Sequence, residues 1–180
     1  MGGVSFTGST STGSIIASLA GKHIKKCVLE LGGADAFLVF PGANLKEAVN
    51  LAIKSRLKNS GQSCLSSKRF ILHSSVQEEF KSLLLSELSY EQIGDPMNPE
   101  TTIGPLATLE QVALLHSQFE SAIRSGATFL RDWKNNNGNF VNPCVICNMS
   151  TSMTCWNEET FGPLFSLGSF ETNESMWNAA

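Results

Sequence analysis

The sequence lacks an apolar run near the roughly 20 residues that a membrane-spanning helix needs. It also lacks an excess of basic residues: the formal net charge at pH 7 is -3, which argues against a nucleic-acid-binding surface. Its first residues, MGGVSFTGST, lack the basic and apolar segments of a secretion signal, and Phe6 stands where a myristoylation signal needs Ser or Thr. We therefore expect a cytoplasmic protein that binds neither nucleic acid nor a membrane.

The sequence also lacks the paired cysteines of a disulfide framework or a zinc site. Its five cysteines are odd in number, which favours reduced thiols. Cys144 and Cys147 have the spacing of half a metal or redox site, but no second such pair accompanies them. They lie in a predicted strand, where residues three apart point to opposite faces, so we interpret them as two buried small residues and expect no metal site.

The composition, with 42% apolar and 16% charged residues, is typical of a globular domain. Predicted strands and helices alternate along the chain. Asn44, Ser75 and Thr108 each stand where an N-cap would start a helix. This alternation predicts an α/β fold with a mainly parallel sheet flanked by helices. The predicted strands cover 4–6, 27–31, 36–40, 68–73, 127–131, 140–146 and a run ending at 170; the predicted helices cover 11–19, 45–57, 75–88, 108–124 and a segment opening near 171.

The stretch FTGSTSTG, residues 6–13, is the first of four short motifs with chemical meaning. Gly8 and Gly13 flank small polar residues at a predicted strand-to-helix turn. Free backbone N–H groups and the positive end of the helix dipole could hold a phosphate there. The stretch matches neither the P-loop nor the GxGxxG pattern, so a plain glycine-rich turn is the alternative.

LELGG and NSGQSC supply a candidate general base and a candidate nucleophile. Glu30 lies near the end of an apolar strand, where a buried carboxylate would have a raised pKa suited to a base near neutral pH. An exposed strand-end glutamate is the alternative. Cys64 is either a thiol activated by a neighbouring group or a small residue in a turn, and the three scattered histidines do not indicate a histidine base.

The fourth motif, NEETFGP at residues 157–163, places acidic residues and an aromatic side chain before a Gly-Pro turn. Glu159 could accept hydrogen bonds from two sugar hydroxyls, and Phe161 could press on a flat ring. A solvated acidic turn before a strand is the alternative interpretation.

Taken together in their chain order, the four motifs resemble those of the aldehyde dehydrogenase superfamily, whose members oxidise aldehydes to acids with NAD or NADP. The matching stretches are FTGS…G, LELGG, GQSC and EETFGP. The separations of 34 residues from Glu30 to Cys64 and 95 from Cys64 to Glu159 match that layout, as do IGDP…TIGPLAT and NFVNP. KKCVLELGGADAFLVF with KRFIL is most similar to the succinate-semialdehyde dehydrogenase group. The resemblance implies a catalytic domain over residues 32–180 and a partial Rossmann-like cofactor domain over residues 1–31.

The resemblance also implies a role for each motif. Cys64 attacks the aldehyde to give a thiohemiacetal, its backbone N–H helps to hold the oxyanion, and hydride transfer to the nicotinamide leaves a thioester. Glu30 activates the water that hydrolyses this thioester. The implied cofactor contacts are the pyrophosphate at Gly8, Ser9 and Gly13, the nicotinamide beside Leu31 and Phe161, and the nicotinamide ribose at Glu159.

Two further positions bear on specificity and regulation. Lys58 stands where semialdehyde-type relatives can carry a cation for the substrate carboxylate; a solvated lysine at a helix end is the alternative. Ser66 stands where some relatives have a second cysteine, so a redox disulfide beside the nucleophile is not expected.

Members of the superfamily are longer than this chain, which resembles their middle-to-late portion. The chain enters on a strand and stops within a helix, so we expect a piece of a larger enzyme, impaired in isolation because an oxyanion asparagine and the adenosine-binding segments lie outside it. The implied partner is a small-molecule aldehyde, and full-length relatives are homo-oligomers. The alternatives are a CoA-acylating aldehyde dehydrogenase, against which Glu30 argues, and a scaffold or subunit-binding module without turnover.

Overall fold

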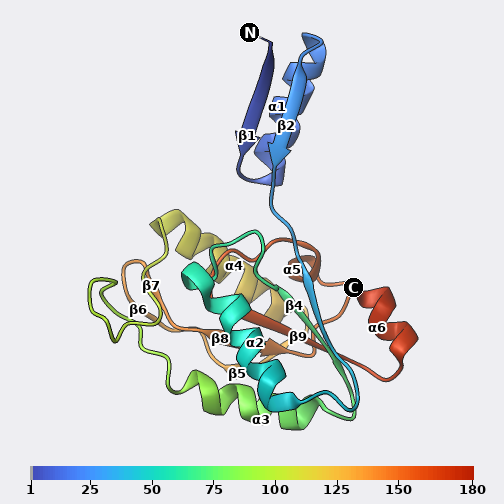
Figure 1. Cartoon of the computed structure of the whole chain (residues 1–180), viewed down its shortest axis with the longest axis vertical. Helices are drawn as coiled ribbons and strands as arrows, with labels where there is room; N and C mark the ends of the chain where they lie inside the picture. Colours follow the sequence, from blue (N-terminus) through green and yellow to red (C-terminus); the bar gives the residue numbers. More distant parts are fainter. Residues whose placement is uncertain (1) are drawn as a thin grey trace. The chain divides into compact units, whose positions relative to one another are not determined.

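The computed structural model describes residues 2–180, and the chain divides into two units, one ending at Gly33 and the other spanning Ala34–Ala180 (Figure 1). The first unit has one two-stranded sheet, and the second unit has a five-stranded sheet and a separate two-stranded one. Within residues 2–180, no helix is long and apolar enough to cross a membrane.

The first unit is a parallel strand–helix–strand motif. Its helix begins after Ser9, whose hydroxyl accepts the N–H of Thr12 at 3.3 Å and so caps the first turn. Among residues 2–33, only Gly13 and Ala20 are buried, so this unit has almost no core of its own. Its elements are β1 (Gly3–Thr7), α1 (Thr10–Lys22) and β2 (Lys26–Glu30), with β1 and β2 paired in parallel.

The second unit is built on a five-stranded sheet in the order β3–β4–β9–β8–β5. Neighbouring strands are parallel except that β5 runs antiparallel to β8. The predicted α/β fold with a mainly parallel sheet is therefore confirmed. The strands are β3 (Ala36–Val39), β4 (Arg69–His73), β9 (Leu164–Phe170), β8 (Cys144–Cys147) and β5 (Thr128–Arg131).

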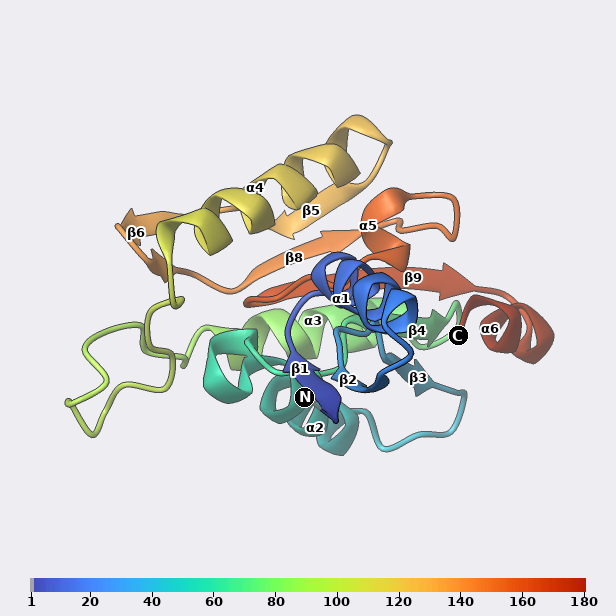
Figure 2. The ribbon, with the colours of Figure 1, turned by 90° about the horizontal axis from the view of Figure 1, so that it is seen from above.

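Helices cover both faces of this sheet, which is why its central strands are apolar on both sides. Figure 2 shows α2 and α4 on opposite sides of the sheet, and each side has its own buried apolar cluster. Residues of α2 and α3 share one cluster, and residues of α4, α5 and α6 share the other. The helices are α2 (Leu45–Leu57), α3 (Gln77–Leu88), α4 (Leu109–Arg124), α5 (Thr154–Asn157) and α6 (Asn173–Ala179).

Cys144 and Cys147 lie on opposite faces of β8, as their spacing in a strand predicts. Both are buried, Cys144 in the cluster under α4 and Cys147 in the cluster under α2 and α3. Among the described residues, no group of three or more potential ligands could hold a metal ion.

Two local predictions were wrong. Ser75 does not cap α3, because its hydroxyl is hydrogen-bonded to Nδ1 of His73 at 2.9 Å, and the helix begins at Gln77 without a side-chain cap. The predicted strand over 140–146 is two strands, because Pro143 has no N–H to pair. The first part, β7 (Phe140–Val141), pairs with β6 (Asn135–Asn137), and the second is β8.

Candidate active site

Cys64 lies in a loop formed by an abrupt reversal after α2. The residues Asn59, Ser60 and Gly61 have φ angles of 53°, 58° and 80°, a left-handed conformation that is unfavourable for non-glycine residues. The hydroxyl of Ser60 donates to the carbonyl of Gly104 at 2.9 Å and helps to hold this conformation. The thiol that follows is exposed.

The loop lies directly against the turn that contains Glu159 and Phe161. A Cβ at Gly61 would collide with the backbone carbonyl of Gly162, so the two segments can approach only because position 61 has no side chain. The structure therefore brings two of the sequence motifs, NSGQSC and EETFGP, together within the second unit.

A buried lysine joins the same two segments. The side chain of Lys68 is 1% exposed, and its Nζ donates to the carbonyls of Ser63 and Cys64, both at 2.8 Å. The same Nζ lies 3.3 Å from Oε1 of Glu159, whose side chain is 22% exposed. Burial lowers the pKa of Lys68 below its usual value, and the charge of Glu159 opposes this effect.

The backbone of the turn is held by three further side chains. Gln118 donates to the carbonyl of residue 159 at 3.0 Å, and Gln111 donates to that of residue 161 at 2.9 Å. Both glutamines come from α4. The guanidinium of Arg56 in α2 donates to the carbonyl of residue 160 at 2.7 Å, so three consecutive carbonyls are each paired.

Arg56 is fully buried between α2 and the start of β9. Its Nε donates to the carbonyl of Leu164 at 2.7 Å, and its Nη2 also reaches the hydroxyl of Thr160 at 3.1 Å. Burial lowers the pKa of Arg56 to about 10, and the interactions with Cys144 and Glu159 counter this effect, so the side chain is a cation near neutral pH. It therefore anchors the turn with charge-assisted hydrogen bonds.

The other cysteines differ from Cys64 in exposure. Burial raises the pKa of the Cys144 thiol to about 12 and those of Cys147 and Cys155 to about 11. Cys27, in β2, is partly buried. Among the described cysteines, Cys64 is the one with an exposed side chain.

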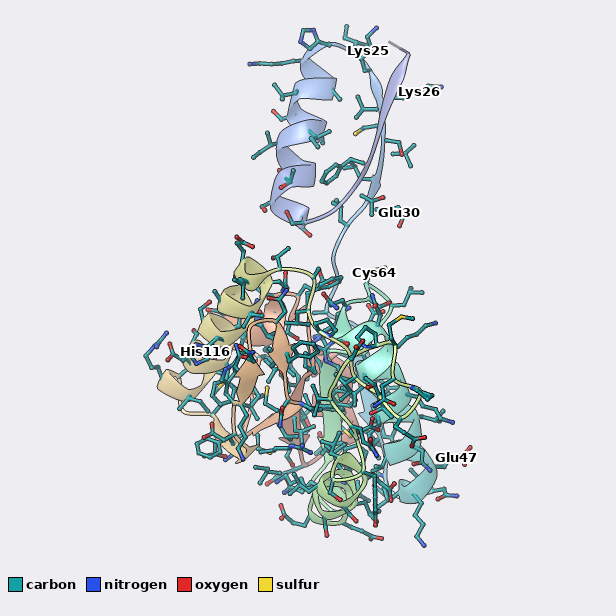
Figure 3. All side chains as sticks on the ribbon, turned by 90° about the vertical axis from the view of Figure 1, so that its left-hand side faces the viewer. Lys25, Lys26, Glu30, Glu47, Cys64 and His116 are labelled. Atoms are coloured by element: carbon teal, nitrogen blue, oxygen red, sulfur yellow. The ribbon has the colours of Figure 1, made fainter. Side chains whose placement is uncertain are left out.

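Histidine takes no part in this site. His73 is bonded to Ser75, and His116 lies 3.8 Å from Glu120 on α4, away from Cys64 in Figure 3. Over residues 2–180, no hydrogen bond joins a histidine to Cys64.

The first unit holds the remaining residues singled out by sequence. The N–H of Gly8 donates to the carbonyl of Glu30 at 3.0 Å, and a Cβ at Gly13 would collide with the side chain of Leu31. Ser9 caps α1. Glu30 ends β2 with an exposed side chain, so the burial that its place at the end of an apolar strand suggested is not observed.

Lys58 has an exposed side chain in the second unit, where it starts the short 3₁₀ turn η1 (Lys58–Gly61). Within the part of the chain that the structure describes, it forms no ion pair. Its two interpretations, a cation for a substrate carboxylate and a solvated lysine, both need such exposure.

The sequence motifs do not include the residues that hold the site together, namely Arg56, Lys68, Gln111 and Gln118. A signal for Arg56 was present, because it follows Val49, Ala52 and Ile53 at helical spacing and so falls on the buried stripe of α2. For Lys68, the signal was weaker: it directly precedes β4, next to a second basic residue, Arg69, and the sequence does not distinguish the two.

The aldehyde dehydrogenase family model matches residues 1–180. The benzaldehyde dehydrogenase YfmT of Bacillus subtilis is 40% identical over 177 residues, which cover 98% of this chain and 36% of that protein. The NADP(+) succinate-semialdehyde dehydrogenase of Mycobacterium avium is 39% identical over 163 residues, covering 89% of this chain and 34% of that protein.

A solved structure of the succinic semialdehyde dehydrogenase from Streptococcus pyogenes, in complex with NADP+, matches with a TM-score of 0.93 and 36% identity. The match covers 99% of this chain and 40% of that one. This chain therefore spans little more than a third of the relatives it resembles. Because the family model and the relatives match nearly every residue, the chain belongs to the aldehyde dehydrogenase family.

Proposed function

We propose that this chain carries the nucleophile-bearing part of an enzyme that oxidises an aldehyde to a carboxylic acid with NAD or NADP. The observation that carries the proposal is the exposed thiol of Cys64, held on a strained loop that Lys68 ties to Glu159. A loop fixed in this way presents its nucleophile in one orientation.

The reaction begins as the Cys64 thiol gives its proton to solvent and Sγ attacks the aldehyde carbon; the C–S bond forms as the C=O π bond breaks, which leaves negative charge on the former carbonyl oxygen. The Cys64 N–H is available to that oxygen, because it donates to no acceptor among residues 2–180. Oxidation of the thiohemiacetal gives a thioester, and water cleaves the C–S bond to release the acid and the thiol. We assign Glu30 as the base that accepts the proton of that water; the LELGG motif, rather than burial of the carboxylate, supports this assignment.

Each unit, taken by itself, has residues that fit one part of a dinucleotide. We assign the pyrophosphate to the turn of Gly8, Ser9 and Gly13. The N–H groups of Thr10 and Ser11 at the start of α1 donate to no acceptor among the described residues, and the first turn has no acidic side chain. The partly exposed carboxylate of Glu159 can accept two ribose hydroxyls, and Leu31 and Phe161 are assigned to the nicotinamide. When bound, NAD or NADP supplies the acceptor for the hydride.

We assign residues 1–31 to the cofactor domain and residues 32–180 to the catalytic domain; the division of the chain after Gly33 supports this assignment. The substrate class that we propose is a semialdehyde such as succinate semialdehyde, with Lys58 pairing with its carboxylate. Two relatives with succinate-semialdehyde dehydrogenase names support this choice. Because the relatives are much longer, we expect the isolated 180-residue polypeptide to turn over poorly.

The test uses an activated ester, p-nitrophenyl acetate, which needs no cofactor to acylate a thiol. The 180-residue chain should release one equivalent of p-nitrophenol rapidly and become acetylated at Cys64, as peptide mapping will show. Cys64→Ala should abolish the burst, whereas Cys27→Ala should keep it. Glu30→Gln should keep the burst but slow the later deacylation.

Labelling with limiting iodoacetamide supplies an independent readout of the same thiol. We expect Cys64 to be alkylated first, because the thiols of Cys144, Cys147 and Cys155 are buried with raised pKa values. Preferential labelling of another cysteine, together with no burst from the ester, would contradict the assignment of Cys64 as nucleophile.

A further inference from the structure

Three oxygen atoms of the site surround the buried ammonium group of Lys68. A buried ammonium is unfavourable unless each N–H is hydrogen-bonded or ion-paired. Its Nζ donates hydrogen bonds to the carbonyls of Ser63 and Cys64, each at 2.8 Å, and forms an ion pair with Oε1 of Glu159 at 3.3 Å. The burial of Lys68 is therefore explained by this set of contacts, all of which lie in the two segments of the site.

The bond from Lys68 to Ser63 also sets the direction of the Cys64 N–H. The carbonyl of residue 63 and the N–H of residue 64 belong to one planar peptide group, and in a trans peptide they point in opposite directions. The chain contains no cis peptide among the described residues. Because the carbonyl points at the buried ammonium, the N–H of Cys64 points away from it.

The same ammonium holds the carboxylate of Glu159. The backbone of that residue is fixed separately by Gln118, so Lys68 acts on the side chain. One cation thus connects the loop of the thiol to the carboxylate that we assign to the cofactor ribose.

We propose that Lys68 is a positioning residue for aldehyde oxidation: it orients the Cys64 N–H toward the developing oxyanion and fixes the Glu159 carboxylate. This inference rests on the proposed function for the roles of Cys64 and Glu159. Lys68 itself touches neither substrate nor cofactor in this scheme.

The experiment compares two reactions of the same thiol. Acylation by p-nitrophenyl acetate passes through a tetrahedral oxyanion, whereas alkylation by iodoacetamide does not. Lys68→Met removes the ammonium and keeps most of the side-chain volume. We expect acylation of Cys64 to slow by roughly tenfold or more, since an oxyanion donor contributes on the order of 10²-fold or more to rate, while alkylation changes less than acylation.

Lys54→Met is the matched control, because Lys54 is an exposed lysine of α2; it should change neither rate. Equal changes of the two rates in Lys68→Met would show a general disturbance and overturn the proposal. If Lys68→Met does not fold, as judged by circular dichroism, Lys68→Arg keeps the charge with a different donor geometry. In Lys68→Arg, the rate of acylation should fall by a larger factor than the rate of alkylation. An equal fold-change in the two rates would again overturn the proposal.

Amide hydrogen exchange separates this inference from the proposed function. Lys68→Met, or Lys68→Arg if the first does not fold, should speed exchange in residues 63–66 and 158–161, while β4 stays protected. Absence of an ester burst in the unmodified chain would reject the proposed function. Unchanged exchange in both segments would reject the inference about Lys68, whatever the ester shows.

Discussion

At the residue scale, the five thiols divide by burial. Cys144, Cys147 and Cys155 pack in the apolar clusters beside the sheet, and burial raises the pKa of each thiol from 9.0 to between about 11 and about 12. The packing that places these side chains in the core also keeps their thiols protonated and inaccessible to reagents.

These raised pKa values predict that the protein loses stability in alkaline solution. Above pH 9 the unfolded chain releases thiol protons that the folded chain keeps, so the free energy of unfolding falls as pH rises toward the folded pKa. Each thiol contributes a slope of about 1.4 kcal/mol per pH unit in that window, and its contribution is complete below pH 9.

Urea unfolding of the Cys147→Ala variant at pH 8 and pH 10 checks this. The difference in unfolding free energy between the two pH values should be smaller than in the unmodified chain by about 1 kcal/mol. Burial lowers the pKa values of Lys68 and Arg56, so these two groups make the free energy of unfolding rise with pH. This contribution is the same in the unmodified chain and in Cys147→Ala, so it cancels in the comparison. Cys64→Ala, which removes an exposed thiol, is the control, and a slope shared by all three proteins would contradict the prediction.

At the element scale, the connection between α2 and β4 depends on one glycine. Gly61 has a φ of 80°, and a Cβ there would collide with the backbone of Gly162. Gly42 has a similar φ of 84° but no atom within 4 Å of the position of a Cβ. A comparison of alanine substitutions at the two glycines therefore separates the free-energy cost of the backbone conformation from the cost of the close approach between the two segments.

We predict that Gly42→Ala lowers the free energy of unfolding by about 1 kcal/mol, the usual penalty for alanine at positive φ. Gly61→Ala should lower it by about 2 kcal/mol more, because the loop and the turn must also move apart. It should also slow acylation of Cys64, whereas Gly42→Ala should not. Chemical denaturation and the ester burst measure these effects, and equal stabilities of the two variants would show that the contact with Gly162 contributes nothing.

Most element boundaries were predictable from local patterns, and the exceptions have local causes. Asn44 and Thr108 accept the N–H groups of Glu47 and Gln111, as their N-cap positions predict. Ser75 failed as a cap because its hydroxyl pairs with a histidine two residues earlier. A cap can be predicted from neighbouring residues, but a competing partner for the same hydroxyl is decided only by the folded backbone.

At the scale of the whole molecule, the two units differ in how much surface they bury. The sheet of the first unit has two strands, and Ile15, Leu19 and Val28 are exposed by 63%, 54% and 62%. An isolated two-stranded sheet is marginally stable in water. In the second unit, β4, β8 and β9 are covered on both faces by buried apolar clusters.

We therefore predict that amides of β1 and β2 in the 180-residue chain exchange with solvent much faster than those of β4 and β9. Local opening of the first unit needs little free energy, whereas exposing the central strands of the second unit requires its global unfolding. Hydrogen exchange followed by mass spectrometry measures both. Comparable protection of β1 and β4 would contradict the prediction.

Local patterns of residues were enough to predict the alternation of strands and helices, the mainly parallel sheet and the family resemblance of the four motifs. They were not enough for the bonds that assemble the site, because Arg56 and its partners Thr160 and Leu164 are 104 and 108 residues apart in the chain. Whether a charged residue is solvated or buried depends on which segments pack around it. The tertiary structure alone decides that Lys68 and Arg56 are buried and that the loop of Cys64 lies against the turn of Glu159.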